Sequence, residues 1–81
     1  MKLHEVTQRM LEKYEDGLVG TSTDGMSVSH FNRLLIELAQ EAGIADGLPA
    51  ELGDCKPHEI SKWTLEIVQH VTAAKAPPDP N

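Results

Sequence analysis

Cys55 and His58 are the two side chains in this sequence with the spacing of metal ligands, C-x-x-H. A structural zinc site needs four such ligands, which typically arrive as two pairs. The other histidines, His4, His30 and His70, stand singly in separate parts of the chain. A thiol beside an imidazole could also act as nucleophile and base, but nothing in the sequence orients the imidazole or supplies oxyanion donors. We therefore expect no metal site, and a partly buried thiol beside a surface histidine.

Glu37 and Glu41 are two carboxylates spaced one helical turn apart. Paired carboxylates do acid–base work where burial raises the pKa of one of them. The apolar pattern of the surrounding residues places both on the solvent side of a helix, which favours a solvated surface. The segment Thr21–Gly25 contains glycine but lacks the G-x-x-x-x-G-K-[ST] spacing of a phosphate loop. The sequence thus predicts a protein without catalytic residues and without a bound cofactor.

Acidic residues outnumber basic residues 13 to 7, which gives a net charge of -6. This balance disfavours a surface that binds nucleic acid directly. The segment Leu34–Glu59 is the most acidic, with six acids against Lys56 alone. Clustered acids attract basic partners and speed the encounter with them. A negative field of this kind can also imitate a phosphate backbone and inhibit a nucleic-acid-binding protein, whereas ordinary solubility charge is the plainer interpretation.

We expect a partner-facing surface where the second predicted helix meets the connection Ala45–Lys56. Its predicted residues are Leu34, Glu37, Glu41, Asp46, Glu51 and Asp54. The expected partner is a protein with a basic surface, or a second copy of the chain. Four apolar residues at the edges of the helical stripes would add an interaction patch or a dimer seam if they were exposed together; they are Leu11, Leu34, Leu65 and Val68.

Three segments have the three–four spacing of apolar residues that is typical of amphipathic helices. They are residues 2–15, 28–42 and 57–75. Leu48–Gly53 is predicted to form one short helical turn, with Pro49 suited to its first position. With no alternating strand pattern, the fold class is expected to be an all-α bundle of three main helices plus one short helical turn. Residues 1–76 form this single domain, and the Pro-rich residues 77–81 are expected to be a disordered tail.

The helix ends have sequence signals of their own. Ser27 is predicted to cap the second helix, Gly43 to end it in the left-handed conformation, and Gly17 to stop the first. Asp54 could cap the third helix from upstream. The predicted core consists of apolar residues from all of these segments: Leu3, Val6, Met10, Phe31, Leu35, Leu38, Leu48, Leu52, Ile60, Trp63, Ile67 and Val71.

The chain is expected to be a soluble, cytoplasmic protein. No apolar run approaches the roughly 18 residues of a membrane span, and no signal peptide opens the sequence. Cys55 is the one cysteine, which excludes an internal disulfide framework.

The stretch Asp24-Gly25-Met26-Ser27 places a serine at the start of the second predicted helix, after a loop, in an acidic chain of 81 residues. It resembles the acyl and peptidyl carrier proteins, and Leu48–Leu52 followed by Pro57 is similar to the stretch between carrier helices two and three. In that family the serine carries a phosphopantetheine arm, and an acidic second helix docks partner enzymes. The resemblance implies attachment at Ser27, although Met26 stands where carriers usually have Asp, His or Asn. The alternative is that Ser27 is a helix cap only.

The segment Leu38–Val71 resembles the C-terminal half of small phage tail assembly chaperones. The residues that carry this likeness are Gly43, Leu48-Pro49, Glu59-Ile60 and Trp63. The resemblance implies an accessory role in protein assembly. From the residues alone, the leading hypothesis is a small acidic protein–protein interaction module without catalytic activity, of the adaptor, accessory or inhibitor kind. The carrier protein and the chaperone-like accessory protein are its alternatives.

Overall fold

The computed structural model of this chain describes residues 1–76. Its elements in chain order are β1 (Lys2–Leu3), α1 (Gln8–Val19), α2 (Val28–Glu41), β2 (Ala45–Asp46), the 3-10 helix η1 (Leu52–Asp54) and α3 (Pro57–Lys75). The predicted all-α bundle of three main helices and one short turn is confirmed. One small addition is the antiparallel pair β1–β2, in which Lys2 lies opposite Asp46 and Leu3 opposite Ala45. The predicted disordered tail, residues 77–81, lies outside the described residues.

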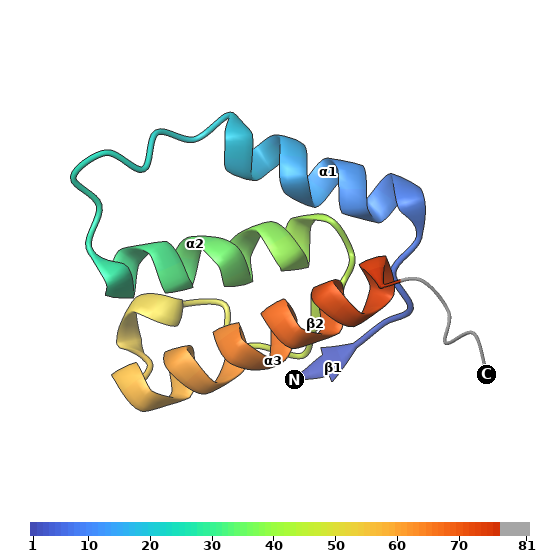
Figure 1. Ribbon diagram of the computed structural model, residues 1–81. Coiled ribbons are helices and arrows are strands. Elements are labelled where there is room, and N and C mark those ends of the chain that lie inside the picture. The colour runs from blue at the N-terminus through green and yellow to red at the C-terminus, as the bar shows by residue number, and fades with distance from the viewer. Residues whose placement is uncertain (77–81) are drawn as a thin grey trace.

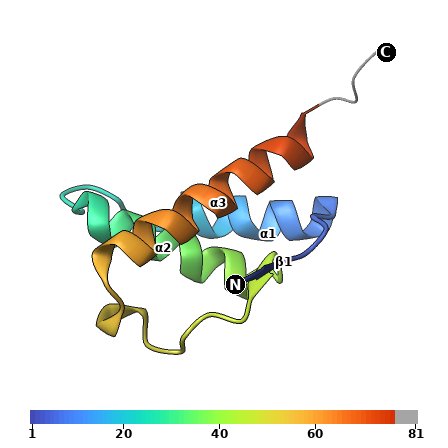
Figure 2. The same ribbon diagram turned by 90° about the horizontal axis from the view of Figure 1, so that it is seen from below.

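Helix α2 is the central element of the bundle (Figure 1). It lies between α1 and α3, and it packs more extensively against α3 than against α1. An ion pair joins the end of α3 to α1, since the Lys75 ammonium lies 3.0 Å from the Glu15 carboxylate. Seen from below, the connection between β2 and α3 loops out on one side of the molecule, and the C-terminal half of α3 extends toward the other (Figure 2). Among the described residues, no helix is both long and apolar enough to cross a membrane.

The predicted first helix over residues 2–15 is wrong at both ends. Thr7 caps α1, since its hydroxyl accepts a hydrogen bond from the Met10 amide at 3.2 Å, and the helix runs on to Val19. Leu3 and Val6 continue the apolar spacing of the helix by coincidence, because the chain before Thr7 is extended and β1 pairs with β2.

Gly17 lies inside α1 and does not end it, contrary to the sequence prediction. A Cβ atom at this position would lie 2.6 Å from Cδ2 of Leu38, a distance that real side chains do not adopt. The missing side chain therefore lets α1 approach α2 closely at the point where Leu38 is buried.

Both predicted ends of α2 are confirmed. The Ser27 hydroxyl accepts a hydrogen bond from the His30 amide at 3.1 Å. After the helix, Gly43 has φ +81, its amide donates to the Gln40 carbonyl at 3.1 Å, and the Ile44 amide donates to the Ala39 carbonyl at 2.9 Å. This pair of bonds is the Schellman arrangement, and it satisfies carbonyls that a helix end leaves unpaired.

Helix α3 covers the predicted range, with Pro57 in its first turn. The predicted cap at Asp54 is wrong. Lys56 occupies the cap position without a side-chain hydrogen bond, and Asp54 lies in η1. The short turn is also shifted, because the helical residues are Leu52–Asp54 and not Leu48–Gly53.

The core lies between α2, α3 and the connection that follows α2. Six predicted core residues are buried: Leu35, Leu38, Leu52, Ile60, Ile67 and Val71. The other six predicted residues pack against this core but are only partly buried; they are Leu3, Val6, Met10, Phe31, Leu48 and Trp63. Six buried apolar residues were not in the predicted core: Tyr14, Ile36, Ala39, Ala42, Ile44 and Ala45. Ile44 and Ala45 belong to the connection, which folds back on α2 after Gly43.

Candidate functional site

Five of the six predicted partner-facing residues are carboxylates, and all five are exposed. We call them the acidic face: Glu37, Glu41, Asp46, Glu51 and Asp54. They come from α2, β2 and the ends of η1. Arg33 of α2 and Glu51 of the connection both lie close to Gly53 in η1. The Arg33 Nη1 atom lies 3.5 Å and the Glu51 Oε1 atom 3.4 Å from the position that a Gly53 Cβ would take.

The carboxylates on α2 project from a well-formed helix. The Glu37 Oε1 atom lies 3.8 Å from Nε of Arg33, and both side chains are about half exposed. An exposed pair of this length contributes little to stability, so Glu37 keeps its capacity to bind a cation from a partner. Glu41 lies one turn further along the helix, and in the part of the chain that the structure describes it forms no ion pair.

Asp46 is the most constrained member of the acidic face. Its Oδ2 atom lies 2.6 Å from Nε2 of His4, and the His4 amide donates a hydrogen bond to the Ile44 carbonyl at 2.8 Å. The His70 ring donates in turn to the His4 carbonyl at 2.7 Å. These bonds tie the first residues of the chain to the connection and to α3. The Asp46 carboxylate is thus already engaged in a hydrogen bond that helps to hold the first residues of the chain in place.

Glu51 and Asp54 flank the short helix η1. The Glu51 carbonyl accepts a hydrogen bond from the Asp54 amide at 3.3 Å, and the Cys55 thiol donates to the same carbonyl at 3.8 Å. These bonds use backbone atoms of the two acidic residues. Within residues 1–76, neither the Glu51 nor the Asp54 carboxylate forms an ion pair. Both carboxylates therefore remain open to a cationic partner.

The predicted apolar edge residues do not form one exposed patch. Leu34 and Leu11 are partly buried and pack against the core. Leu65 and Val68, on α3, are exposed by 57% and 39%. The four apolar residues therefore do not join the acidic face as one exposed surface.

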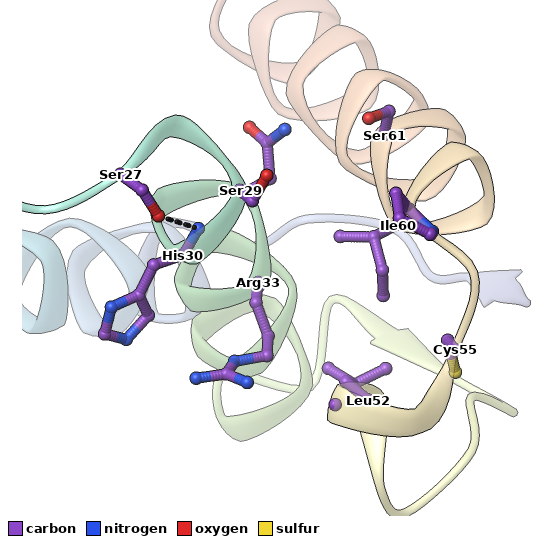
Figure 3. Close-up of a pocket in the computed structure, with 11 residues that line it drawn as sticks. Ser27, Ser29, His30, Arg33, Leu52, Cys55, Ile60 and Ser61 are labelled. Carbon is purple, nitrogen blue, oxygen red and sulfur yellow. Dashed lines mark hydrogen bonds between the residues drawn. The ribbon is translucent and has the colours of Figure 1, made fainter.

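A hollow of about 390 Å³ lies between the start of α2, η1 and the start of α3 (Figure 3). Ser27 and His30 lie at one edge, joined by the cap hydrogen bond. Arg33 extends from α2 toward the side of Leu52, and Ile60 and Ser61 stand on the opposite wall. Sequence reasoning missed this hollow, because its walls come from three segments that are far apart in the chain and share no motif.

Cys55 borders the same hollow and is half-buried, as the sequence predicted. His58 is exposed in the first turn of α3. Among the described residues, no three histidine, cysteine, aspartate or glutamate side chains come together as metal ligands would. The thiol's hydrogen bond to the Glu51 carbonyl gives Cys55 a local structural role at the end of η1.

The fold changes the proton affinity of Tyr14. Its pKa is raised above the ordinary value of 10.0, first because burial disfavours the phenolate and second because the Glu15 carboxylate is close. Tyr14 lies on α1, belongs to the core and does not line the hollow. Its raised pKa therefore bears on stability.

No protein-family model, curated protein sequence or solved structure matches this chain.

Proposed function

We propose that this chain is a small protein–protein interaction module that binds a basic protein surface through the acidic face. The observation that carries the proposal is the uneven distribution of charge over the fold. Helix α3 has two acids and two bases, and α1 has three acids and two bases. From residue 28 to residue 56 there are five acids, and Arg33 and Lys56 are the two bases. Residues 1–27 have five acids and three bases, so the excess of acids over bases is largest from residue 28 to residue 56.

Exposed carboxylates act on a partner mainly through the rate and the selectivity of encounter. Two unit charges about 4 Å apart interact by roughly 1 kcal/mol in water. Several such pairs raise the association rate and exclude acidic partners, with a range of only about 8–10 Å at physiological salt. A second copy of this chain would present the same negative face and be repelled by it. A basic partner fits the observed charges better than self-association does.

Selection of random displayed peptides on three forms of the protein tests the proposal. The first form is the wild type. The face variant removes four charges, E37Q, E41Q, E51Q and D54N. The control variant removes four exposed charges elsewhere, E5Q, E12Q, D16N and D24N. The two variants have the same net charge, so they separate a local surface from a general electrostatic attraction. Asp46 is left unchanged because of its bond to His4.

We expect the wild type and the control variant to enrich peptides rich in lysine and arginine, and the face variant to lose that enrichment. Enrichment of neutral or acidic peptides by the wild type would contradict the proposal. Equal enrichment by all three forms would contradict it as well, because the basic peptides would then not depend on the acidic face.

A second candidate function is that of a carrier protein modified on Ser27. The observation in its favour is that Ser27 is exposed at the start of α2 and borders the hollow, where a bound arm would have room. Incubation with a phosphopantetheinyl transferase and coenzyme A tests it by mass spectrometry. A gain of one phosphopantetheine that is absent from Ser27→Ala supports the carrier function, and an unchanged mass excludes it for the transferase used.

A further inference from the structure

We infer that the hollow between α2, η1 and α3 binds a small organic acid, with a carboxylate held by Arg33 and a short apolar chain held by Leu52 and Ile60. Its volume of about 390 Å³ falls in the range of small-molecule sites, roughly 300–1,000 Å³. The hollow adjoins the acidic face at Arg33, which pairs with Glu37, but the inference does not depend on a protein partner.

The charge of the lining residues selects for an anion. The chain has 13 acids among 81 residues, yet among residues 1–76 no aspartate or glutamate lines the hollow. Arg33 is the one permanently charged residue that these residues contribute to the lining. Arg33 therefore brings a positive charge to the hollow in a protein whose net charge is -6, with Glu37 and Glu51 beside the guanidinium but outside the lining.

Arg33 has hydrogen-bonding capacity to spare. A guanidinium has five N–H donors in a planar fork that matches a carboxylate. Its one ion-pair contact with residues 1–76 is the 3.8 Å approach of Nε to Glu37, on the exposed side of α2. Glu51 also lies close to the guanidinium at Gly53, but neither of these carboxylates lines the hollow. Ser29 and Ser61 line another part of the hollow (Figure 3), where their hydroxyls add hydrogen-bonding groups to its polar side.

The rest of the lining is apolar. Leu52 and Ile60 are buried core residues whose side chains reach the hollow, and Pro57 adds the ring at the start of α3. These groups offer contact to hydrocarbon but no hydrogen bond. An inorganic anion would make no contact with this apolar wall. A carboxylate with a short aliphatic chain can contact both Arg33 and the apolar wall. The arrangement of a few polar groups beside an apolar wall is typical of small-molecule sites.

Titration with hexanoate, followed by the amide NMR spectrum, tests this inference. Hexanol and hexylamine are the matched probes, since they keep the chain and change the head group. We expect hexanoate to shift amides at the start of α2, in η1 and at the start of α3, with saturation, and the other two probes to shift them much less. Equal shifts with hexanol or with hexylamine would overturn the inference, because binding would then not need the carboxylate.

Three variants make the test specific. Arg33→Gln is expected to weaken hexanoate binding by about tenfold or more, the loss of a hydrogen bond to a charged group. The control Arg9→Gln removes an exposed arginine from α1 and should leave the affinity unchanged. Ser61→Leu fills part of the hollow without changing the charge. It should abolish the saturable amide shifts with hexanoate, while its circular dichroism spectrum stays that of the wild type. Unaltered binding in Arg33→Gln or in Ser61→Leu would overturn the inference.

Discussion

Gly17→Ala tests the close packing of α1 on α2. The substitution raises the helix propensity of α1 but adds a methyl group against Leu38, and the size of each effect can be estimated. Alanine in a helix interior is more favourable than glycine by about 1 kcal/mol. The new methyl group would lie 2.6 Å from Cδ2 of Leu38, which is buried and has little room to move. Overpacking of a core costs about 1–3 kcal/mol. We therefore expect the Gly17→Ala variant to have a lower free energy of unfolding, by about 1 kcal/mol.

The sign of this effect should reverse when Leu38 is shortened. In Leu38→Val the δ carbons are absent, and the nearest atom of the original side chain to the new methyl is Cγ at 3.7 Å, an ordinary contact. Leu38→Val alone should cost about 1 kcal/mol, for one buried methylene and a small cavity. In this background Gly17→Ala should stabilise by about 1 kcal/mol, because only the helix propensity remains.

Urea unfolding of the four proteins, followed by far-ultraviolet circular dichroism, measures the coupling. A domain of 81 residues has about 4–12 kcal/mol of stability, so all four forms should remain folded. The predicted coupling between the two sites is about 1–3 kcal/mol, the range for residues in contact. An equal effect of Gly17→Ala in both backgrounds would refute the close approach of α1 to α2 at these residues.

Other predictions follow from single features of the structure. Ser27→Ala should lower the free energy of unfolding by about 1 kcal/mol in urea titrations, because the His30 amide loses its cap. Ser27→Asp should keep most of the wild-type free energy of unfolding, because aspartate is also a good cap. Equal losses in the two variants would contradict the cap. Gly43→Ala should cost about 1–2 kcal/mol, since its positive φ is strained for alanine, and no loss would show that the left-handed turn is not formed. The raised pKa of Tyr14 means that the folded state holds the phenol proton more tightly than the unfolded state does. Its contribution to stability is therefore complete below about pH 10 and lost as the pH rises through the folded pKa. Tyr14→Phe should show a shallower loss of stability than the wild type above about pH 10 in urea titrations, and identical slopes would contradict the burial of the phenol.

The sequence predicted those helix ends that depend on one or two local residues. Ser27, Gly43 and Pro57 each act within one helical turn of the chain, so their types alone indicate where α2 and α3 begin or end. Residue type predicted helix ends poorly where tertiary contacts determine them. Gly17 looks like a helix stop, yet Leu38 packs against it and the helix continues.

The limits of α1 and the width of the core could not be predicted for a related reason. Leu3 keeps helical spacing with Met10, but β1 gains backbone hydrogen bonds by pairing with β2, a segment more than 40 residues away. Ile44 is fully buried where the connection folds back on α2, its amide bonded to the Ala39 carbonyl. No local sequence pattern indicates where the connection after α2 folds back onto the helix.

The two candidate sites differ in the same way. The exposure of Glu37 and Glu41 follows from the periodicity of one helix, and it could be predicted. The approach of Arg33 and Glu51 to Gly53, and the hollow beside Ser27, arise where η1 meets the starts of two helices. Those features depend on three separate segments of the chain, so they could be identified only in the structure.

The most direct test of the account measures the affinity of one basic peptide from the selection for the wild type, the face variant and the control variant by isothermal titration calorimetry. We predict that the face variant binds at least about tenfold more weakly, that the control variant binds as the wild type does, and that wild-type affinity falls steeply between about 50 and 300 mM NaCl. Equal weakening in the two variants would show that net charge alone attracts the peptide. An unchanged affinity in the face variant would show that Glu37, Glu41, Glu51 and Asp54 do not form the binding surface.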